Sequence, residues 1–562
     1  MTEKTLSRKI ALKLLGAHIQ RYWYLLIGSL LFAVGFVILS LYVPKLVGSA
    51  TDLIVAEGNV DITGVVGYVI KILIVVALAA ISQYVMNLCN NRLTYNVIRD
   101  VRQEAFEAIQ TLPLARIDRR PSGELVSKVI VDVDQLAEGL LMGFSQIFTG
   151  VITIVFTLFY MFIVNWLIAV VVVVLTPLSI VIARFVANHT FDMFKLQSEI
   201  RASQTDLIDS SIKGARVVQA FNRQEKTIEA MEEESEKLEK AYLRATFFSS
   251  LVNPSTRFVN NIVYAFVAVV GSLVAIKTSQ TSISVGGLVC VLAYATQYMK
   301  PFNEISGVIA ELQNALACAS RVFGLIEEDK IVDDGEKTLE DVAGDIEVQN
   351  VDFSYIKDKP VLKDVNIDVK SGDTIAIIGE TGGGKTTFIN LLMRFYDVDN
   401  GSIKVDGIDI RELSRKSLRD SFGMVLQDTW VRNQTVADNI RFGNPDASDE
   451  EVVAVAKEAH AHNFIKKLPD GYNTMIAEDG ENLSLGERQL LCIARVMLDL
   501  PPMLILDEAT SSIDTRTEKR IQRAFDKMMN GRTTFIVAHR LSTIEKADVV
   551  LKMENGTLKK VR

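Results

Sequence analysis

The chain has 562 residues, 49% of them hydrophobic, with a formal net charge of −8. A chain of this length is too long for one compact core, so we expect several domains. The acidic balance argues against a broad nucleic-acid-binding surface, which would need an excess of basic side chains.

Apolar stretches dominate the first 323 residues, and charged residues gather after them. Six stretches are each long enough to cross a hydrocarbon core of about 30 Å. They cover residues 22–43, 66–88, 139–163, 166–187, 258–276 and 284–305. Any one of them could be a buried helix of a soluble protein, but six in succession favour a transmembrane domain. Residues 1–20 mix basic and apolar side chains, which is typical of an amphipathic helix at the inner membrane surface.

The connections between these stretches are alternately short and long. A polar loop at residues 52–61, a turn at Asn165 and a few residues after Lys277 are the short ones. The long connections, about 89–138 and 188–250, are charged and helical in pattern and hold most of the Lys and Arg. The positive-inside rule therefore places them, and both termini, in the cytoplasm. We expect helical rods with turns near 117–124 and 206–216, positioned to contact a cytosolic domain.

A soluble domain is expected at residues 343–562, after an acidic linker at 324–342. Its apolar runs alternate with helical patterns, which favours an α/β domain with a parallel sheet. The predicted strands cover residues 346–355, 374–378, 424–426, 503–506 and 533–537.

A complete phosphate-binding loop, Gly-Glu-Thr-Gly-Gly-Gly-Lys-Thr, occupies residues 379–386 of this domain. Glycines such as Gly379, Gly382 and Gly384 let the backbone turn its N–H groups toward a phosphate. Lys385 would reach the β/γ oxygens, and the Thr386 hydroxyl would bind Mg²⁺. A glycine-rich turn alone would be weak evidence, but a strand precedes this one and a helical pattern follows it. The motif predicts a P-loop that binds a nucleoside triphosphate, with Thr387 as a further binding residue.

Two acidic residues end the apolar run Leu504 to Leu506, which reads as a buried strand of the sheet. Asp507 would hold the Mg²⁺ shell, and Glu508 would orient or deprotonate the water that attacks the γ-phosphate. Such a pair is often only a solvated strand end. The phosphate loop upstream favours catalysis.

Between these motifs lies Leu-Ser-Leu-Gly-Glu-Arg-Gln at residues 483–489, which resembles the signature sequence of ATP-binding-cassette (ABC) proteins. The resemblance covers the whole chain, because six membrane stretches followed by one cassette are similar to a bacterial ABC exporter half-transporter. It implies a multi-pass cell-membrane protein that uses ATP and Mg²⁺. In its fold, six transmembrane helices with long cytosolic extensions precede an α/β P-loop ATPase domain.

The resemblance also assigns roles to single residues. Tyr355 matches the aromatic that stacks on adenine, Gln427 the Q-loop glutamine that senses Mg²⁺, and His539 the switch histidine at the γ-phosphate. Ser484 and Gly486 match the backbone that caps the ATP of a second cassette. Because one chain carries one cassette, the family's head-to-tail arrangement requires a second half-transporter subunit.

The signature departs from the family's usual Leu-Ser-Gly-Gly-Gln at Leu485 and Glu487. A carboxylate near bound phosphates weakens the contact electrostatically. In two-gene exporters of this kind, one subunit keeps the glutamate and histidine but has an altered signature, which describes this chain. We therefore favour a heterodimer with one strong and one weak ATP site, with a homodimer as the alternative.

Only polar residues in the membrane stretches give any indication of the transported substrate. Arg257, Asn260, Asn261 and Gln297 are candidates to line a central cavity, although they could equally satisfy helix–helix contacts. The substrate would be a drug, a lipid or a peptide, and the partners include membrane lipids but no nucleic acid. The alternative function is an ATP-gated channel or a regulatory subunit, which ion flux without stoichiometric ATP use would reveal.

Overall fold

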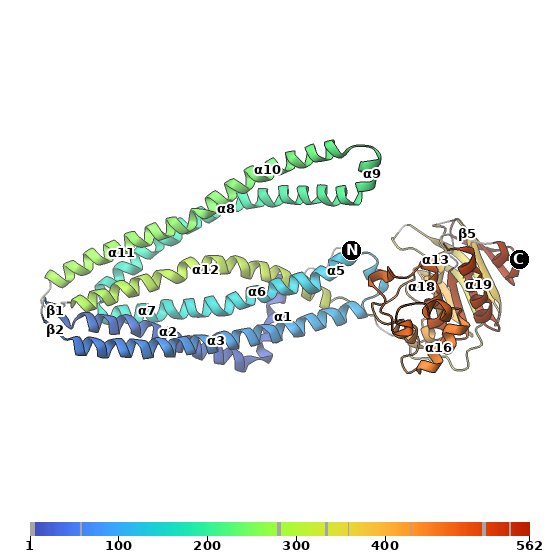
Figure 1. Cartoon of the computed structure of the whole chain (residues 1–562), viewed down its shortest axis with the longest axis horizontal. Coiled ribbons are helices and arrows are strands. Elements are labelled where there is room, and N and C mark those ends of the chain that lie inside the picture. Colours follow the sequence, from blue (N-terminus) through green and yellow to red (C-terminus); the bar gives the residue numbers. More distant parts are fainter. Residues whose placement is uncertain are drawn as a thin grey trace. The chain divides into compact units, whose positions relative to one another are not determined.

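The computed structural model describes residues 6–56, 59–277, 283–331, 335–357, 359–380, 382–427, 429–507, 513–538 and 541–562, without some side chains in the helices. The chain divides into two compact units (Figure 1). The helical unit contains residues 1–110 and 123–328, and the cassette unit contains residues 111–122 and 329–562. The division assigns 324–328 to the helical unit and the short segment 111–122 to the cassette unit.

The helical unit is built from long helices and one short β-hairpin, whose strands have three and two residues. Its elements are α1 Arg8–Arg21, α2 Trp23–Thr51, β1 Ile54–Ala56, β2 Asn59–Val60, α3 Ile62–Thr111, α5 Ser122–Ser127, the π-helical turn η1 Lys128–Asp132, α6 Val133–Met142, the π-helical turn η2 Gly143–Ile147, α7 Phe148–Val164, α8 Trp166–Lys213, α9 Ala215–Ala220, α10 Gln224–Ser250, α11 Val252–Lys277 and α12 Val285–Ile326.

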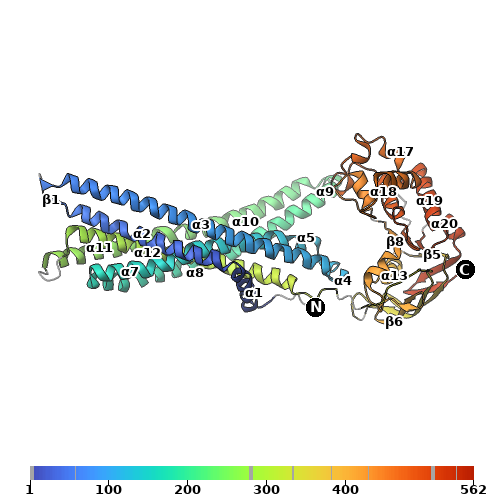
Figure 2. The ribbon, with the colours of Figure 1, turned by 90° about the horizontal axis from the view of Figure 1, so that it is seen from below.

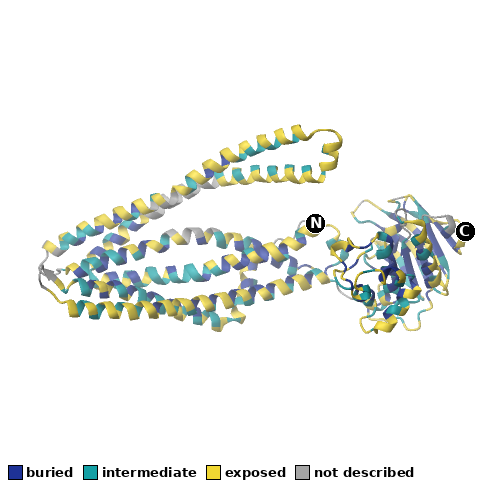
Figure 3. Ribbon diagram, in the orientation of Figure 1, coloured by how far each residue is buried: buried dark blue, intermediate teal, exposed yellow. Residues whose placement is uncertain are grey.

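Helices cover each of the six predicted membrane stretches. Within the described residues, four helical segments are long and apolar enough to cross a membrane: Trp23–Thr51, Ile62–Thr111, Ser122–Val164 and Arg257–Val274. A shorter apolar helix covers Trp166–Pro177. Large apolar side chains on the outside of these helices, such as Leu31 at 68% and Phe258 at 67%, are exposed (Figure 3). Such side chains suit contact with lipid, and the total of six spans stays a prediction.

The predicted turn at Asn165 is confirmed. Its side-chain oxygen accepts hydrogen bonds from the N–H groups of Leu167 and Ile168, at 3.1 and 3.2 Å, and caps α8. The predicted turn at 206–216 begins too early, because α8 continues to Lys213 and Gly214 follows as its C-cap. α9 then leads into α10, which packs along α8 (Figures 1 and 2).

Glycines bring α2 and α12 into backbone contact. A Cβ built on Gly286 would lie 1.9 Å from the carbonyl oxygen of Gly48. Beside this contact, the Asp52 carboxylate accepts from the Gly286 N–H at 2.7 Å and from the Ser284 hydroxyl at 2.8 Å. The carboxylate thus occupies the N-terminus of α12, where a negative charge is favourable.

The cassette unit contains two sheets and the helices around them. Its elements are α4 Leu114–Ile117, β3 Ile346–Phe353, β4 Leu362–Val369, β5 Thr374–Gly379, α13 Lys385–Leu392, β6 Asn400–Val405, β7 Ile408–Asp409, α14 Arg415–Asp420, β8 Phe422–Val425, α15 Val436–Arg441, α16 Asp449–Glu458, α17 His462–Ile465, the 3₁₀ turns η3 Gly471–Asn473 and η4 Glu478–Gly480, α18 Leu485–Met497, β9 Met503–Asp507, α19 Thr515–Met529, β10 Thr533–Val537, α20 Leu541–Lys546, β11 Val549–Glu554 and β12 Thr557–Lys560.

The larger sheet has the strand order β12-β11-β5-β10-β9-β8, and all its pairs are parallel except β11 with β12. An antiparallel sheet, β4-β3-β6-β7, lies beside it in the unit. The five predicted strands are confirmed in position as β3, β5, β8, β9 and β10. The sequence patterns did not reveal β4, β6, β7, β11 and β12.

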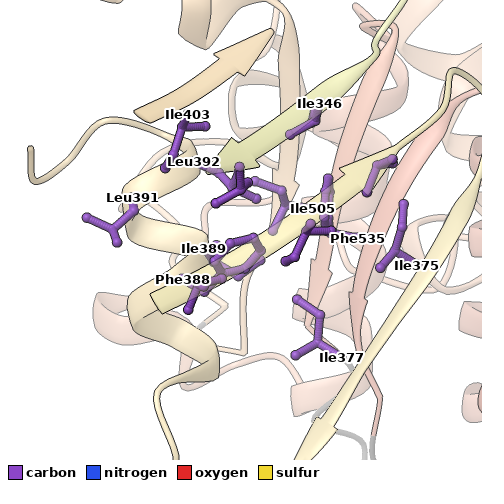
Figure 4. Packing of buried hydrophobic residues seen from close by; sticks show 14 of the residues in the cluster. Ile346, Ile375, Ile377, Phe388, Ile389, Leu391, Leu392, Ile403, Ile505 and Phe535 are labelled. Carbon is purple, nitrogen blue, oxygen red and sulfur yellow. The ribbon is translucent and has the colours of Figure 1, made fainter. Parts of the chain in front are cut away.

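Successive residues of the parallel strands pack into two different cores. Ile375 and Ile377 of β5 join Phe388 of α13 and Phe535 of β10 in one cluster (Figure 4). The residue between them, Ala376, belongs to a second cluster on the opposite face. This period of two follows from the pleat of a strand, and burial on both faces explains the continuous apolar runs.

Candidate functional site

The phosphate loop connects β5 to α13 and has backbone angles that glycine favours. Gly379, Gly382 and Gly384 have φ values of 149°, 80° and 106°. A Cβ on Gly379 would also lie 2.5 Å from the carbonyl oxygen of Met553. Both the left-handed backbone and this close approach require glycine, so the sequence interpretation of the loop agrees with its geometry.

Lys385 opens α13 and is only 7% exposed. Its ammonium group donates to the carbonyl oxygens of Gly379, at 2.8 Å, and Glu380, at 2.9 Å. These bonds hold the positive charge over the loop at a helix N-terminus, where phosphates bind. The next residue, Thr386, is exposed, so its hydroxyl is accessible.

Parallel strands bring the other predicted residues to the same edge of the sheet. Asp507 ends β9 and is paired with Val537 of β10, which is paired in turn with Ile377 of β5. Since neighbouring strands lie about 4.8 Å apart, the Asp507 backbone lies about 10 Å from the strand that enters the phosphate loop. Carboxylate and hydroxyl oxygens are the ligands that Mg²⁺ prefers, and Asp507 and Thr386 supply both types.

Gln427 follows the end of β8 at this edge and lines a cavity of about 290 Å³. Leu485 and Arg488 of the signature also line it, together with residues that the sequence analysis did not identify: Thr429, Trp430, Val431 and Asp479. Trp430 is 56% exposed. The cavity therefore joins the glutamine after β8 to the N-terminal turn of the signature helix α18.

Tyr355 belongs to a cluster of three aromatic rings. Its ring centroid lies 4.9 Å from that of Phe353 and 5.1 Å from that of Tyr396, both edge to face. The Tyr355 hydroxyl lies 3.1 Å from the Thr387 hydroxyl on α13. The predicted adenine platform is thus hydrogen-bonded to the helix that begins with Lys385 and Thr386.

The segment 111–122 contacts this aromatic cluster. The Arg119 guanidinium donates to the Tyr355 carbonyl oxygen at 2.7 Å, and the Tyr396 hydroxyl donates to the Asp118 carboxylate. Burial and this hydrogen bond raise the pKa of Tyr396 above its ordinary value. The phenol therefore stays protonated and keeps donating at physiological pH. The expected contact of the turn near 117–124 with the cytosolic domain is thus confirmed, whereas the sequence did not identify its partner Tyr396, which lies 278 positions from Asp118.

A capping box starts the signature helix α18. The Ser484 hydroxyl and N–H both donate to the Glu487 carboxylate, at 2.8 and 2.9 Å, and the Glu487 N–H donates back to the hydroxyl. Gly486 is buried, and a Cβ on it would lie 2.5 Å from Cγ2 of Thr517 on α19. Gly486 is therefore needed for close packing of α18 on α19, besides any role at a phosphate.

Asp514 caps the N-terminus of α19. Its carboxylate accepts from the N–H groups of Arg516 and Thr517, both at 3.0 Å. Bonds from Thr517 in particular lower the pKa of Asp514. Glu508 and His539, the predicted base and switch histidine, lie outside the described residues.

The four predicted substrate residues are not brought together in one described cavity. Gln297 on α12 lines a cavity of about 390 Å³ in the helical unit. Arg257, Asn260 and Asn261 lie on α11, and none of them lines that cavity. Arg257 and Asn261 are exposed, and Asn260 is partly buried.

Comparisons with known proteins place both units in one family. A model of the ABC transporter transmembrane region matches residues 26–302, and a model of the ABC transporter domain matches residues 362–511. A Bacillus subtilis relative, an uncharacterised ABC transporter ATP-binding protein, is 34% identical over 557 residues, which cover 99% of this chain and 91% of the relative. The chain belongs to the ABC transporters.

Other relatives of this ABC transporter have more specific names. A fatty acid ABC transporter ATP-binding/permease protein of Mycobacterium bovis is 38% identical over 458 residues, 82% of this chain and 72% of the relative. An ATP-dependent lipid A-core flippase of Escherichia coli is 31% identical over 503 residues, 89% and 86% of the two chains. Membership in this exporter group makes the chain an ATP-hydrolysing membrane transporter of bacterial type that binds ATP and works as a dimer.

Proposed function

We propose that this ABC transporter is the catalytically intact subunit of a heterodimeric exporter that moves an amphipathic or hydrophobic substrate out of the cytoplasm. The observation that carries the proposal is the arrangement at one sheet edge, where the phosphate loop, Asp507 and Gln427 follow neighbouring parallel strands. Drugs, lipids and peptides all fit this class, and relatives named for fatty acid and lipid A-core favour a lipid.

Mg²⁺ would be held by the hydroxyl of Thr386 and the carboxylate of Asp507, with Gln427 completing the site. When bound, the cation neutralises charge on the transferred phosphoryl group. Lys385 positions the phosphates, Tyr355 and Thr387 position the nucleotide from the adenine side, and Glu508 takes the proton of the attacking water. His539 contributes a contact to the γ-phosphate.

The heterodimer rests on the capping box of α18. Ser484 and Gly486 would cap the ATP held by the partner's phosphate loop, but Glu487 already binds the Ser484 hydroxyl and N–H. Its carboxylate also lies at the helix N-terminus that a phosphate would approach. The partner's ATP would therefore be held weakly, while a partner with an unaltered signature would cap the ATP of this chain tightly.

The long helices transmit closure of the cassettes to the membrane. Both termini and the α8–α9–α10 rod would be cytoplasmic, as the distribution of Lys and Arg indicates. Val217 on α9 and the following Phe221 are 61% and 72% exposed. In a domain-swapped dimer these side chains would enter the partner's equivalent of the cavity beside Trp430 and Leu485.

The test is ATP hydrolysis by the full chain in lipid nanodiscs, with and without a candidate partner, beside the Glu508→Gln variant. We expect little activity from the chain alone, and activity with the partner that falls at least about a hundredfold in the variant, the usual effect of losing a catalytic base. Strong activity of the chain alone that is lost in Glu508→Gln would replace the heterodimer with a homodimer. Ion flux without stoichiometric hydrolysis would replace the exporter with a channel.

A further inference from the structure

The helical unit contains a cavity of about 390 Å³ between α2, α3 and α12. This volume lies within the range of about 300–1,000 Å³ found for small-molecule sites. Its lining comes from the C-terminal half of α2, the first half of α3 and the first turns of α12. The lining residues are Phe36, Ser40, Val43, Pro44, Val47, Val76, Ala79, Ala80, Gln83, Val289, Ala293 and Gln297.

Small residues on α2, α3 and α12 explain why a cavity exists here. A Cβ on Gly35 would lie 3.8 Å from Oγ of Ser82 on α3, and Gly48 meets Gly286 of α12. Gly48 and Gly286 thus let α2 and α12 approach closely after the cavity, whereas the contact of Gly35 with α3 would also accommodate a larger residue. Between these contacts the lining includes small side chains such as Ala80 and Ala293, which leave the volume open.

The chemistry of the lining is apolar with isolated polar groups. Gln83 and Gln297 each offer one acceptor oxygen and two N–H donors, and no side chain among the lining residues is charged. An ion placed here would lose its hydration without gaining a counter-charge, which is strongly unfavourable. The lining therefore selects an uncharged group.

Pro44 leaves one backbone carbonyl of α2 without its helical donor. It lies inside α2 and has no N–H, so the carbonyl oxygen of Ser40, four residues earlier, lacks its α-helical donor. Both residues line the cavity. In a membrane, where water does not reach such a carbonyl, a hydroxyl or amide N–H from a ligand would supply the missing donor.

We propose that this cavity binds the substrate of the exporter as an uncharged amphiphile. An aliphatic chain would lie against Phe36, Val43 and Val289. A hydroxyl or primary amide head group would bind the Gln83 and Gln297 side chains and donate to the Ser40 carbonyl. The inference rests on the proposed function and narrows its substrate class to amphiphiles without charge at the head group.

Photo-crosslinking to the full chain in nanodiscs tests the proposal. Three probes share one hexadecyl chain with a diazirine and differ in the head group: a primary amide, a carboxylate and a trimethylammonium. We expect the amide to label peptides containing residues 36–47, 76–83 or 289–297 at least about tenfold more than either charged probe, because an unpaired charge is costly there.

Two variants and a control make the test specific. Ala293→Leu narrows the cavity and should lower the labelling several-fold, and Gln297→Ala removes the amide without narrowing the cavity and should also lower amide labelling several-fold. Ala77→Leu adds the same methyl groups on an exposed part of α3 that does not line the cavity, and should change nothing. Equal labelling by all three probes, unchanged in Ala293→Leu, would mean that bulk lipid reaches these helices and would overturn the proposal.

ATP hydrolysis measured on the same samples separates this inference from the proposed function. Active wild-type protein without selective labelling refutes only the cavity assignment. If the protein is labelled selectively but does not hydrolyse ATP, even with a partner, the binding site is supported and the proposed exporter function is refuted.

Discussion

Removing one hydroxyl tests whether the segment 111–122 positions the adenine platform. Tyr396→Phe keeps the ring against Tyr355 but deletes the hydrogen bond to Asp118. A hydrogen bond to a charged group contributes about 1.5–3 kcal/mol, and the exposure of Asp118 favours the lower end. Without this bond the segment is held less firmly, and with it Arg119, which donates to the Tyr355 carbonyl. The free energy that keeps Tyr355 in place for adenine therefore falls by about 1.5 kcal/mol.

The expected result is a Kd for ATP that rises by up to about tenfold, measured by equilibrium binding of a fluorescent ATP analogue to the full chain in nanodiscs. Tyr472→Phe is the matched control, because it deletes a phenol hydrogen bond to His462 elsewhere in the cassette unit. Asp118→Asn keeps an acceptor without the charge and should give an intermediate Kd. Equal affinities of the wild type and both Tyr396→Phe and Asp118→Asn would refute a positioning role for the segment.

Three further changes test packing, pH dependence and the signature. Gly286→Ala must push α12 away from Gly48, at a cost of about 1–3 kcal/mol, and should lower the Tm of the protein in detergent, whereas Gly16→Ala meets no neighbour and should not. Burial lowers the pKa of His460 from its ordinary 6.5, so the stability that it contributes is full above pH 6.5 and is lost as the pH falls through the folded pKa. Asparagine tolerates the φ of 59° at this position, so His460→Asn should reduce this loss of Tm at acid pH. Glu487→Gln should strengthen ATP binding at the partner's site.

The packing and pH predictions would each be contradicted by one outcome. An unchanged Tm in Gly286→Ala would mean that the two helices separate at little cost. Parallel Tm–pH curves for the wild type and His460→Asn would mean that other groups account for the acid loss, such as His462, whose pKa is also lowered.

Local chemistry made the nucleotide site predictable from the sequence. Glycines at 379, 382 and 384 are required by φ values that other residues rarely adopt, so their spacing identifies the loop directly. The strands β5, β9 and β10 are continuous apolar runs because both faces of the sheet are buried. The parallel order then brings Gln427 and Asp507 to the phosphate loop without further information.

Features that depend on long-range packing could not be predicted. The contact of Asp118 with Tyr396 follows from the fold and leaves no pattern in the sequence. The turn expected at 206–216 is found only at the C-terminal end of that range, because α8 continues to Lys213 and Gly214 is its C-cap. Inside α8, the Ser211 hydroxyl instead bonds to the Leu207 carbonyl at 2.6 Å, so this polar residue is compatible with a continuing helix.

The signature is where charge and geometry must be weighed together. At about 5 Å, repulsion between the Glu487 carboxylate and one phosphate charge is about 1–3 kcal/mol, depending on solvent screening. The capping box adds competition, because each Ser484 donor must leave Glu487 before it binds a phosphate, at about 1 kcal/mol per hydrogen bond.

Glu487→Gln separates these two effects. Glutamine also forms capping boxes, so the helix start is preserved while the charge is removed. If repulsion dominates, the variant in complex with its partner should bind ATP roughly tenfold more tightly at the partner's phosphate loop, measured by nucleotide titration. If Ser484 is held by the capping box alone, Gln would leave the affinity unchanged and Glu487→Ala would raise it. Unchanged affinity in both variants would contradict the weak site that the heterodimer requires.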